Sequence, residues 1–476
     1  MRNSNLPWIV GMRNLRGTRL PAYNPLAHFG LPLAHVLILV GLSLVAVAAP
    51  VRAQAAQESN WWEELFKGPG TSSQSRRQEQ PKKAAPDDLR SNSTPYRSDL
   101  MVETMQRAIE RYQVIVSKGG WPRVPPGRTL RPGDSDDTII VLRKRLRVTG
   151  DMPVRGDEYY YAYNDITFDS DVEAAVRRFQ ARHGIRVTGR VDLATIAALN
   201  VPAEARLNQL RLNLDRLREL LAQRVEDRYI LVNVPAFQLE AVDRFEVQQR
   251  HRVIVGRTER QTPSIKATIK ALNFFPYWRV PDSVAQLDLI PRLRKEPQYL
   301  DQEKIRVFAT NGLQEIDHQN IDWNQADATK IKFKQDPGPQ NALGLVRIDM
   351  SNPEGVYMHD TPMKNLFDQS GRAFSAGCVR VQGVFKLAEW IARYEVGWDQ
   401  PGRVEDVLQS GQALDLNLSH PIPVYFTYIT AWAEPNGLIE FRPDLYGRDG
   451  GREFLAGGER EPGEGPTPQQ ERALAP

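Results

Sequence analysis

Cysteine is almost absent from this sequence, because its 476 residues contain a single one, Cys378. One cysteine excludes a disulfide within the chain and a metal site built from several thiolates. Histidine is scarce too, with seven in the chain, and none joins Cys, Asp or Glu at the spacing of a metal site. A Gly-x-Ser-x-Gly turn is also missing, which excludes the usual serine-nucleophile motif. We therefore expect no metal site.

The first 53 residues lack acidic side chains and long apolar runs. The apolar run Val36–Ala49 is shorter than the roughly 20 residues of a membrane-spanning helix and suits the core of a secretion signal. The same 53 residues hold five arginines, so the net charge of +4 belongs to this leader and the remainder carries −1. That balance gives no support for a nucleic-acid partner. We expect 1–53 to be a signal peptide, with an uncleaved membrane anchor as the alternative.

Apolar residues are sparse again in two further segments. Residues 54–96 are rich in Gln, Ser, Lys, Pro and Arg, and 449–476 are rich in Gly, Glu and Pro. Such compositions cannot bury enough apolar surface to order a chain. We expect a disordered tether at 54–96 and a disordered tail at 449–476.

What is present between these segments begins with helical periodicity. Apolar residues recur at helical spacing from Leu100 to Ile115 and again from Leu207 to Leu221. We expect helices in 97–127 and 202–226 that pack on each other as a scaffold. Between them, three short helical patterns predict a small helical module at 128–201, in which Asp169 or Ser170 caps a helix that ends near His183.

After Glu226 the pattern becomes strand-like, with short apolar runs separated by turns, which predicts a β-sheet domain at 227–448. Apolar runs end at Val255, Phe275 and Met350, and a last strand is expected at 423–429. The polar segment from about 282 to 334 interrupts this pattern. An insertion of this length usually forms a lid or subdomain.

The single thiol has chemically suitable neighbours. Cys378 follows Gly377, with Ser375 three positions before it, Arg380 two positions after it and His359 at the end of an earlier apolar strand. A thiol with a pKa of about 8.5 becomes an effective nucleophile beside a histidine. A buried, inert cysteine is the alternative. We expect adjacent strands to bring His359 to Cys378, and backbone amides at Gly377 and Cys378 to face a developing oxyanion. Arg380 either binds a substrate carboxylate or holds a loop.

These residues resemble a known family. The run Tyr357-Met-His359-Asp360-Thr361-Pro362 and the run Arg372-Ala-Phe-Ser-Ala-Gly-Cys-Val-Arg-Val381 resemble the catalytic signature of L,D-transpeptidases with a YkuD-type domain. Residues 128–201 resemble the peptidoglycan-binding module of cell-wall enzymes. This similarity implies a multidomain α+β protein of the large Gram-negative subgroup, with a mainly-β catalytic domain, an inserted lid, a helical scaffold and a wall-binding module. Many members have histidine where this chain has Ala376.

The resemblance also implies a reaction. Cys378 is expected to form a thioester with a tetrapeptide donor stem and release D-Ala, while His359 acts as general base and acid. An amine of a second stem then gives a 3→3 cross-link, with no cofactor. Tyr277, Trp278, Tyr357 and Trp323 are the expected substrate contacts. The implied location is the periplasm, and the implied partners are peptidoglycan, other cell-wall enzymes and outer-membrane proteins.

Three alternatives remain open on the sequence. Water could resolve the thioester, which would make a carboxypeptidase or endopeptidase. A protein amine could resolve it, which would attach an outer-membrane protein to the wall. A vestigial site would leave a non-catalytic structural protein that binds the wall.

Overall fold

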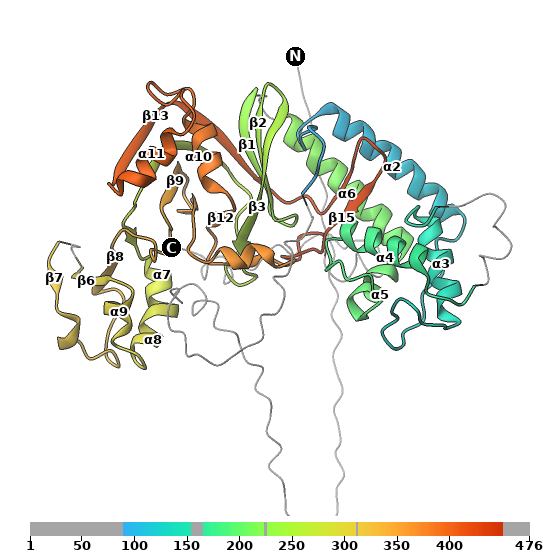
Figure 1. The fold of residues 1–476 in the computed structure, drawn as a ribbon, viewed down its shortest axis with the longest axis horizontal. Helices are drawn as coiled ribbons and strands as arrows, with labels where there is room; N and C mark the ends of the chain where they lie inside the picture. The colour runs from blue at the N-terminus through green and yellow to red at the C-terminus, as the bar shows by residue number, and fades with distance from the viewer. Residues whose placement is uncertain (1–88, 154–164, 223–225, 311–312, 451–476) are drawn as a thin grey trace, which may run out of the picture. The chain divides into compact units, whose positions relative to one another are not determined.

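The computed structural model describes residues 89–153, 165–222, 226–310 and 313–450. These residues are drawn in colour in Figure 1, and they fall within residues 59–476, one of the two units into which the chain divides. The expected signal peptide, most of the expected tether, part of the Tyr-rich insert in the module and nearly all of the expected tail lie outside the described residues. Among the described helices, none is long and apolar enough to span a membrane.

Two long helices pack on each other as the periodicity predicts. They are α2 (Asp99–Ser117) and α6 (Ala203–Ala222). The side chain of Ser98 caps α2 by accepting a hydrogen bond from the Met101 amide at 3.2 Å. Their apolar faces share a core with a two-stranded hairpin near the end of the described chain, formed by β14 (Ala431–Ala433) and β15 (Ile439–Phe441). Strand β15 therefore packs with the scaffold helices.

The small module has its own core. It consists of α3 (Thr138–Val148), α4 (Ser170–Arg182) and α5 (Leu193–Leu199). The side chain of Asp169 caps α4 as predicted, because it accepts a hydrogen bond from the Val172 amide at 2.9 Å. Helix α4 ends at the cap residue His183, and Gly184 follows with a φ of +62°.

A nine-stranded sheet forms most of the following domain. Its strands, in spatial order, are β11 (Ala373–Ser375), β3 (Glu246–Gly256), β12 (Val379–Val381), β10 (Met358–His359), β9 (Val346–Ser351), β4 (Lys266–Phe274), β13 (Leu414–Thr427), β1 (Arg228–Asn233) and β2 (Gln238–Asp243). Strand β2 also pairs with β3, so the sheet closes on itself like a barrel. The strand expected at 423–429 is confirmed over 423–427, which form the end of β13 between β4 and β1.

Helices α10 (Val384–Ala392) and α11 (Arg403–Ser410) pack against the core of this sheet. The core consists mainly of alternate strand residues, since successive side chains of a strand point to opposite faces. Met358 and Val379 both belong to it. The residues next to them in sequence therefore face the other side.

The inserted segment folds as a subdomain with its own sheet. Strands β5 (Trp278–Arg279), β8 (Ile331–Gln335), β6 (Ile305–Ala309) and β7 (Glu315–Ile316) lie side by side in that order. Short helical turns complete it: α7 (Asp282–Val284), η2 (Ala285–Leu289), α8 (Ile290–Leu293), α9 (Tyr299–Gln302) and η3 (His318–Asn320). Its core continues into the main domain through Ile254 and the turn η4 (Lys364–Asp368).

Two expectations of disorder are wrong at their inner ends. Arg90 and Tyr96 belong to the expected tether, yet they are 8% and 1% exposed. Asp449 belongs to the expected tail, yet it is 3% exposed and accepts a hydrogen bond from Arg216 at 2.5 Å. Buried contacts with distant parts of the chain order these residues, and local composition does not record such contacts.

Candidate active site

The register of three neighbouring strands forms the site. His359 on β10 lies opposite Arg380 on β12 and opposite Arg347 on β9. Tyr357 and Cys378 lie next to this row, and the Val379 amide donates to the Tyr357 carbonyl at 3.0 Å. Because side chains alternate along a strand, all five face the side of the sheet opposite to its core. The structure thus brings the predicted cysteine and histidine to one face of adjacent strands.

His359 is held as a neutral base. Its Nδ1 lies 2.5 Å from the carbonyl oxygen of Asp360, which can only accept a hydrogen bond. The proton of the neutral ring is therefore on Nδ1, and the lone pair is on Nε2. Burial lowers the pKa of the imidazole to about 3, and the charges of Arg380, Lys364 and Arg347 act in the same direction. At neutral pH the ring is free to accept a proton.

Cys378 is held as a neutral thiol. Burial raises the pKa of its thiol, while hydrogen bonds from Tyr357 and the charges of Arg380 and Arg347 act against this shift. The pair therefore consists of a protonated thiol and an unprotonated imidazole. Attack by the sulfur requires transfer of its proton to a base, and His359 is on the same face to receive it.

The backbone before the cysteine is fixed by side chains. The Ser375 hydroxyl donates to the Cys378 carbonyl at 2.5 Å and accepts from the Gly377 amide at 3.2 Å. Gly377 has a φ of +117°, a conformation that favours glycine. The expectation that the Gly377 amide faces an oxyanion is wrong here, since Ser375 already binds that N–H group. The described residues supply no acceptor for the Cys378 amide, which remains as a donor.

Arg380 is nearly buried, with 2% of its surface exposed. Its charge lowers the pKa of both His359 and Cys378. Asp360, beside His359, accepts a hydrogen bond from the Leu345 amide at 3.1 Å and forms an ion pair with Lys364. These contacts hold the segment that supplies the acceptor for the His359 proton.

The four aromatic residues expected to contact substrate lie in different surroundings. Tyr357 is part of the site, and the Trp278 contact to its hydroxyl links it to the inserted subdomain. Trp278 is 5% exposed, whereas Tyr277 is 46% exposed with the Lys334 ammonium 3.8 Å from its ring centre. Trp323 is 5% exposed and stacks on Phe333. Its ring therefore lies in the core of the subdomain and does not form an open wall.

Three residues of the site were not identified from the sequence. Arg347 could have been found from the alternation of Leu345–Met350, had the pairing of β9 with β10 been known. Thr262 donates a hydrogen bond to the Gly377 carbonyl at 2.8 Å, and Tyr446 hydrogen-bonds the Thr262 amide at 3.2 Å. No sequence signal marks such contacts between distant segments.

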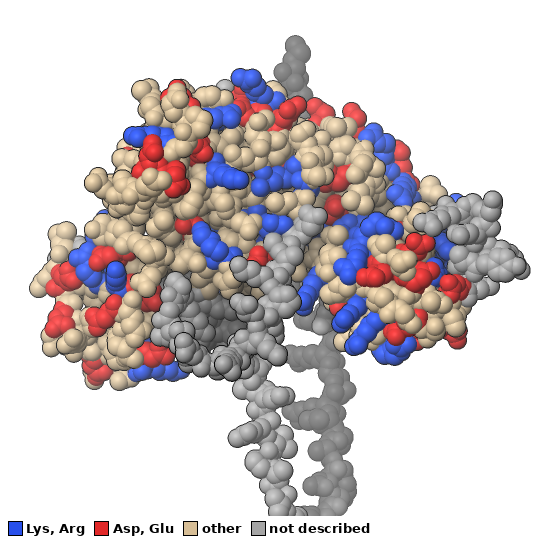
Figure 2. All heavy atoms as spheres, viewed as in Figure 1, with Lys and Arg blue, Asp and Glu red and all other residues tan. Residues whose placement is uncertain are grey.

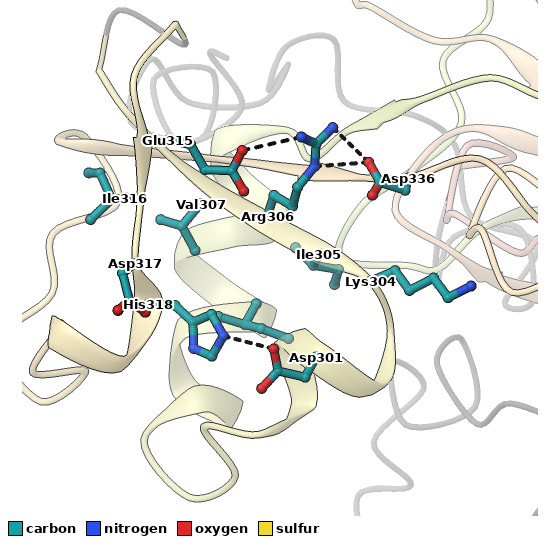
Figure 3. Close-up of a pocket in the computed structure, with 11 residues that line it drawn as sticks. Asp301, Lys304, Ile305, Arg306, Val307, Glu315, Ile316, Asp317, His318 and Asp336 are labelled. Atoms are coloured by element: carbon teal, nitrogen blue, oxygen red, sulfur yellow. Dashed lines mark hydrogen bonds and ion pairs between the residues drawn. The ribbon is translucent and has the colours of Figure 1, made fainter.

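The inserted subdomain also has a polar pocket of about 490 Å³ (Figure 3). Ion pairs and a hydrogen bond lie on its walls: Arg306 is 3.2 Å from Glu315 and 2.8 Å from Asp336, and His318 hydrogen-bonds Asp301 at 2.9 Å. It contains none of the residues of the row described above. Over the described ranges, no group of three His, Cys, Asp or Glu side chains is arranged to hold a metal ion. Figure 2 shows Lys and Arg interspersed with Asp and Glu on the face in view.

Comparisons with known proteins agree with this geometry. Residues 227–405 match the YkuD model, described as "L,D-transpeptidase catalytic domain", and residues 157–199 match the model described as "Putative peptidoglycan binding domain". A curated protein of Haemophilus influenzae, described as "Putative L,D-transpeptidase", is 32% identical over 221 residues, which are 46% of this chain and 44% of that protein. The chain thus matches less than half the length of this relative.

Two solved L,D-transpeptidases also match. The one from Xylanimonas cellulosilytica is 12% identical with a TM-score of 0.20, over 64% of this chain and 99% of that one. The one from Stackebrandtia nassauensis is 12% identical with a TM-score of 0.24, over 63% of this chain and 94% of that one. The matched residues 227–405 include the strand pairing that carries Cys378 and His359, so this part of the chain is similar to the L,D-transpeptidase catalytic-domain family.

Proposed function

We propose that this protein is a peptidoglycan L,D-transpeptidase with Cys378 as nucleophile and His359 as general base and acid. The observation that carries this proposal is the pairing of β10 with β12, which puts a neutral imidazole and a lone thiol on one face of the sheet. Acyl transfer through a thioester is the reaction class that such a pair supports.

The first half of the reaction forms the thioester. Nε2 of His359 takes the thiol proton as the sulfur of Cys378 bonds to the carbonyl carbon at the L-centre of diaminopimelate in a tetrapeptide stem. The Cys378 amide donates to the oxyanion that develops. The intermediate then collapses, its carbon–nitrogen bond to D-Ala breaks, and the imidazolium gives its proton to the leaving amine.

The second half uses the same groups in reverse. The side-chain amine of a second stem attacks the thioester carbonyl, and His359 takes a proton from this amine. The carbon–sulfur bond breaks, the sulfur recovers a proton, and a 3→3 cross-link results. Arg380 and Arg347 keep the imidazole unprotonated between steps, since a nearby positive charge disfavours a second cation.

Location and wall attachment follow from the same proposal. A substrate in the wall requires export, which the expected signal peptide at 1–53 would provide, with the periplasm as destination. The helical module at 128–201 would bring the enzyme to the glycan, and Tyr277, the exposed aromatic beside the subdomain, is the proposed contact for a stem peptide.

The test is product analysis with purified tetrapeptide muropeptides and mass spectrometry. The wild-type protein should form cross-linked dimers, and Cys378→Ala should form none. His359→Ala should lower the rate by about 10²- to 10⁴-fold. His420→Ala, which removes an imidazole that is 66% exposed, is the matched control and should keep the wild-type rate.

The other outcomes identify the alternatives. Cysteine-dependent release of D-Ala without dimers would show that water resolves the thioester. The absence of any cysteine-dependent product would indicate a structural protein that binds the wall, and would contradict the proposed function.

A further inference from the structure

The loop between β3 and β4, residues 257–265, contacts the backbone around Cys378 at two points. Arg257 donates its amide to the Ser375 carbonyl at 3.0 Å. The Thr262 hydroxyl donates to the Gly377 carbonyl at 2.8 Å and accepts from the Gly256 amide at 2.8 Å. Thr262 is 0% exposed. This hydroxyl is therefore a fixed, fully buried anchor for the carbonyl that immediately precedes the nucleophile.

Tyr446 and Arg448, near the end of the described chain, hydrogen-bond this loop and the strand end before it. The Tyr446 hydroxyl donates to the Gly256 carbonyl at 2.5 Å and accepts from the Thr262 amide at 3.2 Å. Arg448 stacks on the Tyr446 ring at 4.9 Å and donates to Gln261 at 2.7 Å. The Tyr446 phenol thus binds both the Thr262 amide and the carbonyl of Gly256, the residue whose amide donates to the Thr262 hydroxyl.

The anchored carbonyl belongs to the same peptide unit as the Cys378 amide. A trans peptide is planar, and its C=O and N–H groups point in opposite directions. The hydrogen bond from Thr262 to the Gly377 carbonyl therefore determines the direction of the Cys378 N–H. The two Ser375 hydrogen bonds hold the peptide units before and after this one and do not engage it, and glycine has wide conformational freedom. The described residues offer this N–H no acceptor, so it is left to a substrate.

We propose that Thr262, held in turn by Tyr446, is a positioning residue that aims the Cys378 amide at the oxyanion formed during acyl transfer. The proposal rests on the proposed function for the identity of the substrate. The orientation of the Cys378 amide matters for any reaction in which the Cys378 sulfur adds to a carbonyl. Removal of an oxyanion donor typically lowers the rate by about 10²- to 10³-fold. Loss of the Thr262 hydroxyl should have a smaller effect, since the Cys378 amide remains and still points at the oxyanion part of the time.

The experiment compares two reactions of Cys378 in the full chain. Acylation by a carbapenem, followed by intact mass, adds the sulfur to a carbonyl and forms an oxyanion. Alkylation by iodoacetamide uses the same thiol and forms none. Thr262→Val removes the hydroxyl at nearly constant volume and should slow acylation by about 10- to 100-fold while alkylation changes less than about 3-fold. Thr262→Ser keeps the hydroxyl and should recover most of the acylation rate.

Two further variants separate positioning from stability. Tyr446→Phe should also slow acylation, by a smaller factor than Thr262→Val does. Tyr425→Phe is the matched control, because this buried phenol on β13 donates to Glu226 at 2.5 Å, and it should keep the wild-type ratio of the two rates. The pH profile of alkylation should be unchanged in all four variants.

Several results would overturn the proposal. They are an unchanged acylation rate in Thr262→Val, an equal fall of both rates, a Thr262→Ser variant as slow as Thr262→Val, or a wild-type protein that is alkylated and never acylated. A wild-type protein that is acylated but forms no wall product would contradict the proposed function alone, and the variants would still test the positioning.

Discussion

His359 lies between two arginines on neighbouring strands, an arrangement that opposes protonation of its ring. Arg380 and Arg347 occupy the same row of the sheet, and both charges lower the pKa of the imidazole. A thiolate–imidazolium pair would put a third positive charge into this row. The site instead favours a neutral pair, in which the base acts during the attack of the sulfur.

This arrangement predicts an unusual pH dependence. Burial lowers the pKa of His359 to about 3 from an ordinary value of 6.5, so the base stays unprotonated as the pH falls through the usual range. We expect the acidic fall of kcat/KM to begin well below pH 6.5. Arg380→Met should shift this fall to higher pH, because one cation of the row is gone, and Arg347→Met should shift it less.

The measurement is kcat/KM for cross-link formation as a function of pH, with carbapenem acylation as a second probe. An acidic limb near 6.5 in the wild-type protein would contradict a neutral, buried base. A limb that stays in place in Arg380→Met would show that the charge of Arg380 does not lower the pKa of His359.

At the scale of elements, the end of α4 meets the hairpin of β14 and β15. Arg182 donates to the Ile439 carbonyl at 3.2 Å, and Arg442 donates to the Arg182 carbonyl at 3.2 Å. A Cβ at Gly184 would lie 2.5 Å from Cδ of Arg442. Arg442 cannot easily move away, since it is 5% exposed and stacks on Trp432 at 4.6 Å. This glycine therefore permits close docking of the module.

Gly184→Ala should destabilise the protein by about 2–3 kcal/mol, about 1 of it from the positive φ and the rest from the displaced arginine. Gly133→Ala is the matched control, because Gly133 also has a positive φ but has nothing within 4 Å of its Cβ position. It should cost about 1 kcal/mol. Chemical denaturation measures both, and equal losses would show that docking against Arg442 contributes nothing.

The elements that the sequence predicted are those with clear periodicity. The two scaffold helices and the strands from β1 to β4 alternate or repeat strongly enough to appear in the sequence alone. The strands of the inserted subdomain were missed. β8 alternates Ile331 and Phe333 with lysines over only five residues, and β5 and β7 have two residues each. Such segments acquire their strand conformation from their neighbours in the sheet.

The site was predictable only to the extent that its residues are local. Ser375, Gly377, Cys378 and Arg380 stand together in the sequence, and His359 was expected from the chemistry of the thiol. The row that includes Arg347 depends on which strands pair, which alternation alone does not show. The role of the Gly377 amide was mispredicted because the contact that occupies it, Ser375 Oγ, becomes visible only in the folded loop.

At the scale of the whole molecule, one buried arginine joins three distant segments. Arg90 lies before the first scaffold helix, and its guanidinium is 2.7 Å from Glu240 on β2 and 2.6 Å from Glu434 beside the hairpin. Arg250 also reaches Glu240 at 3.0 Å, and the Trp432 indole donates to Glu434 at 2.6 Å. Arg90, Glu240 and Glu434 are 8%, 0% and 4% exposed. These ion pairs join the start of the described chain to the sheet and to the segment near the end of the described chain.

Arg90→Met should therefore destabilise the protein by about 3–5 kcal/mol at neutral pH, because it leaves buried carboxylates without their main cation. Arg107→Met, which removes an ion pair at 3.8 Å with both side chains more than half exposed, is the control and should change little. Burial would raise the pKa of Glu434, but Arg90 holds it below its ordinary value, so the wild-type pair stabilises the protein at neutral pH and weakens as the pH falls. In Arg90→Met the unpaired Glu434 takes up a proton in mild acid, which removes the buried charge. The difference in unfolding free energy between the two proteins should therefore become smaller as the pH falls from about 7 to about 5, and chemical denaturation measures it. A difference that stays constant would show that packing of the Arg90 side chain, not its charge, joins the three segments.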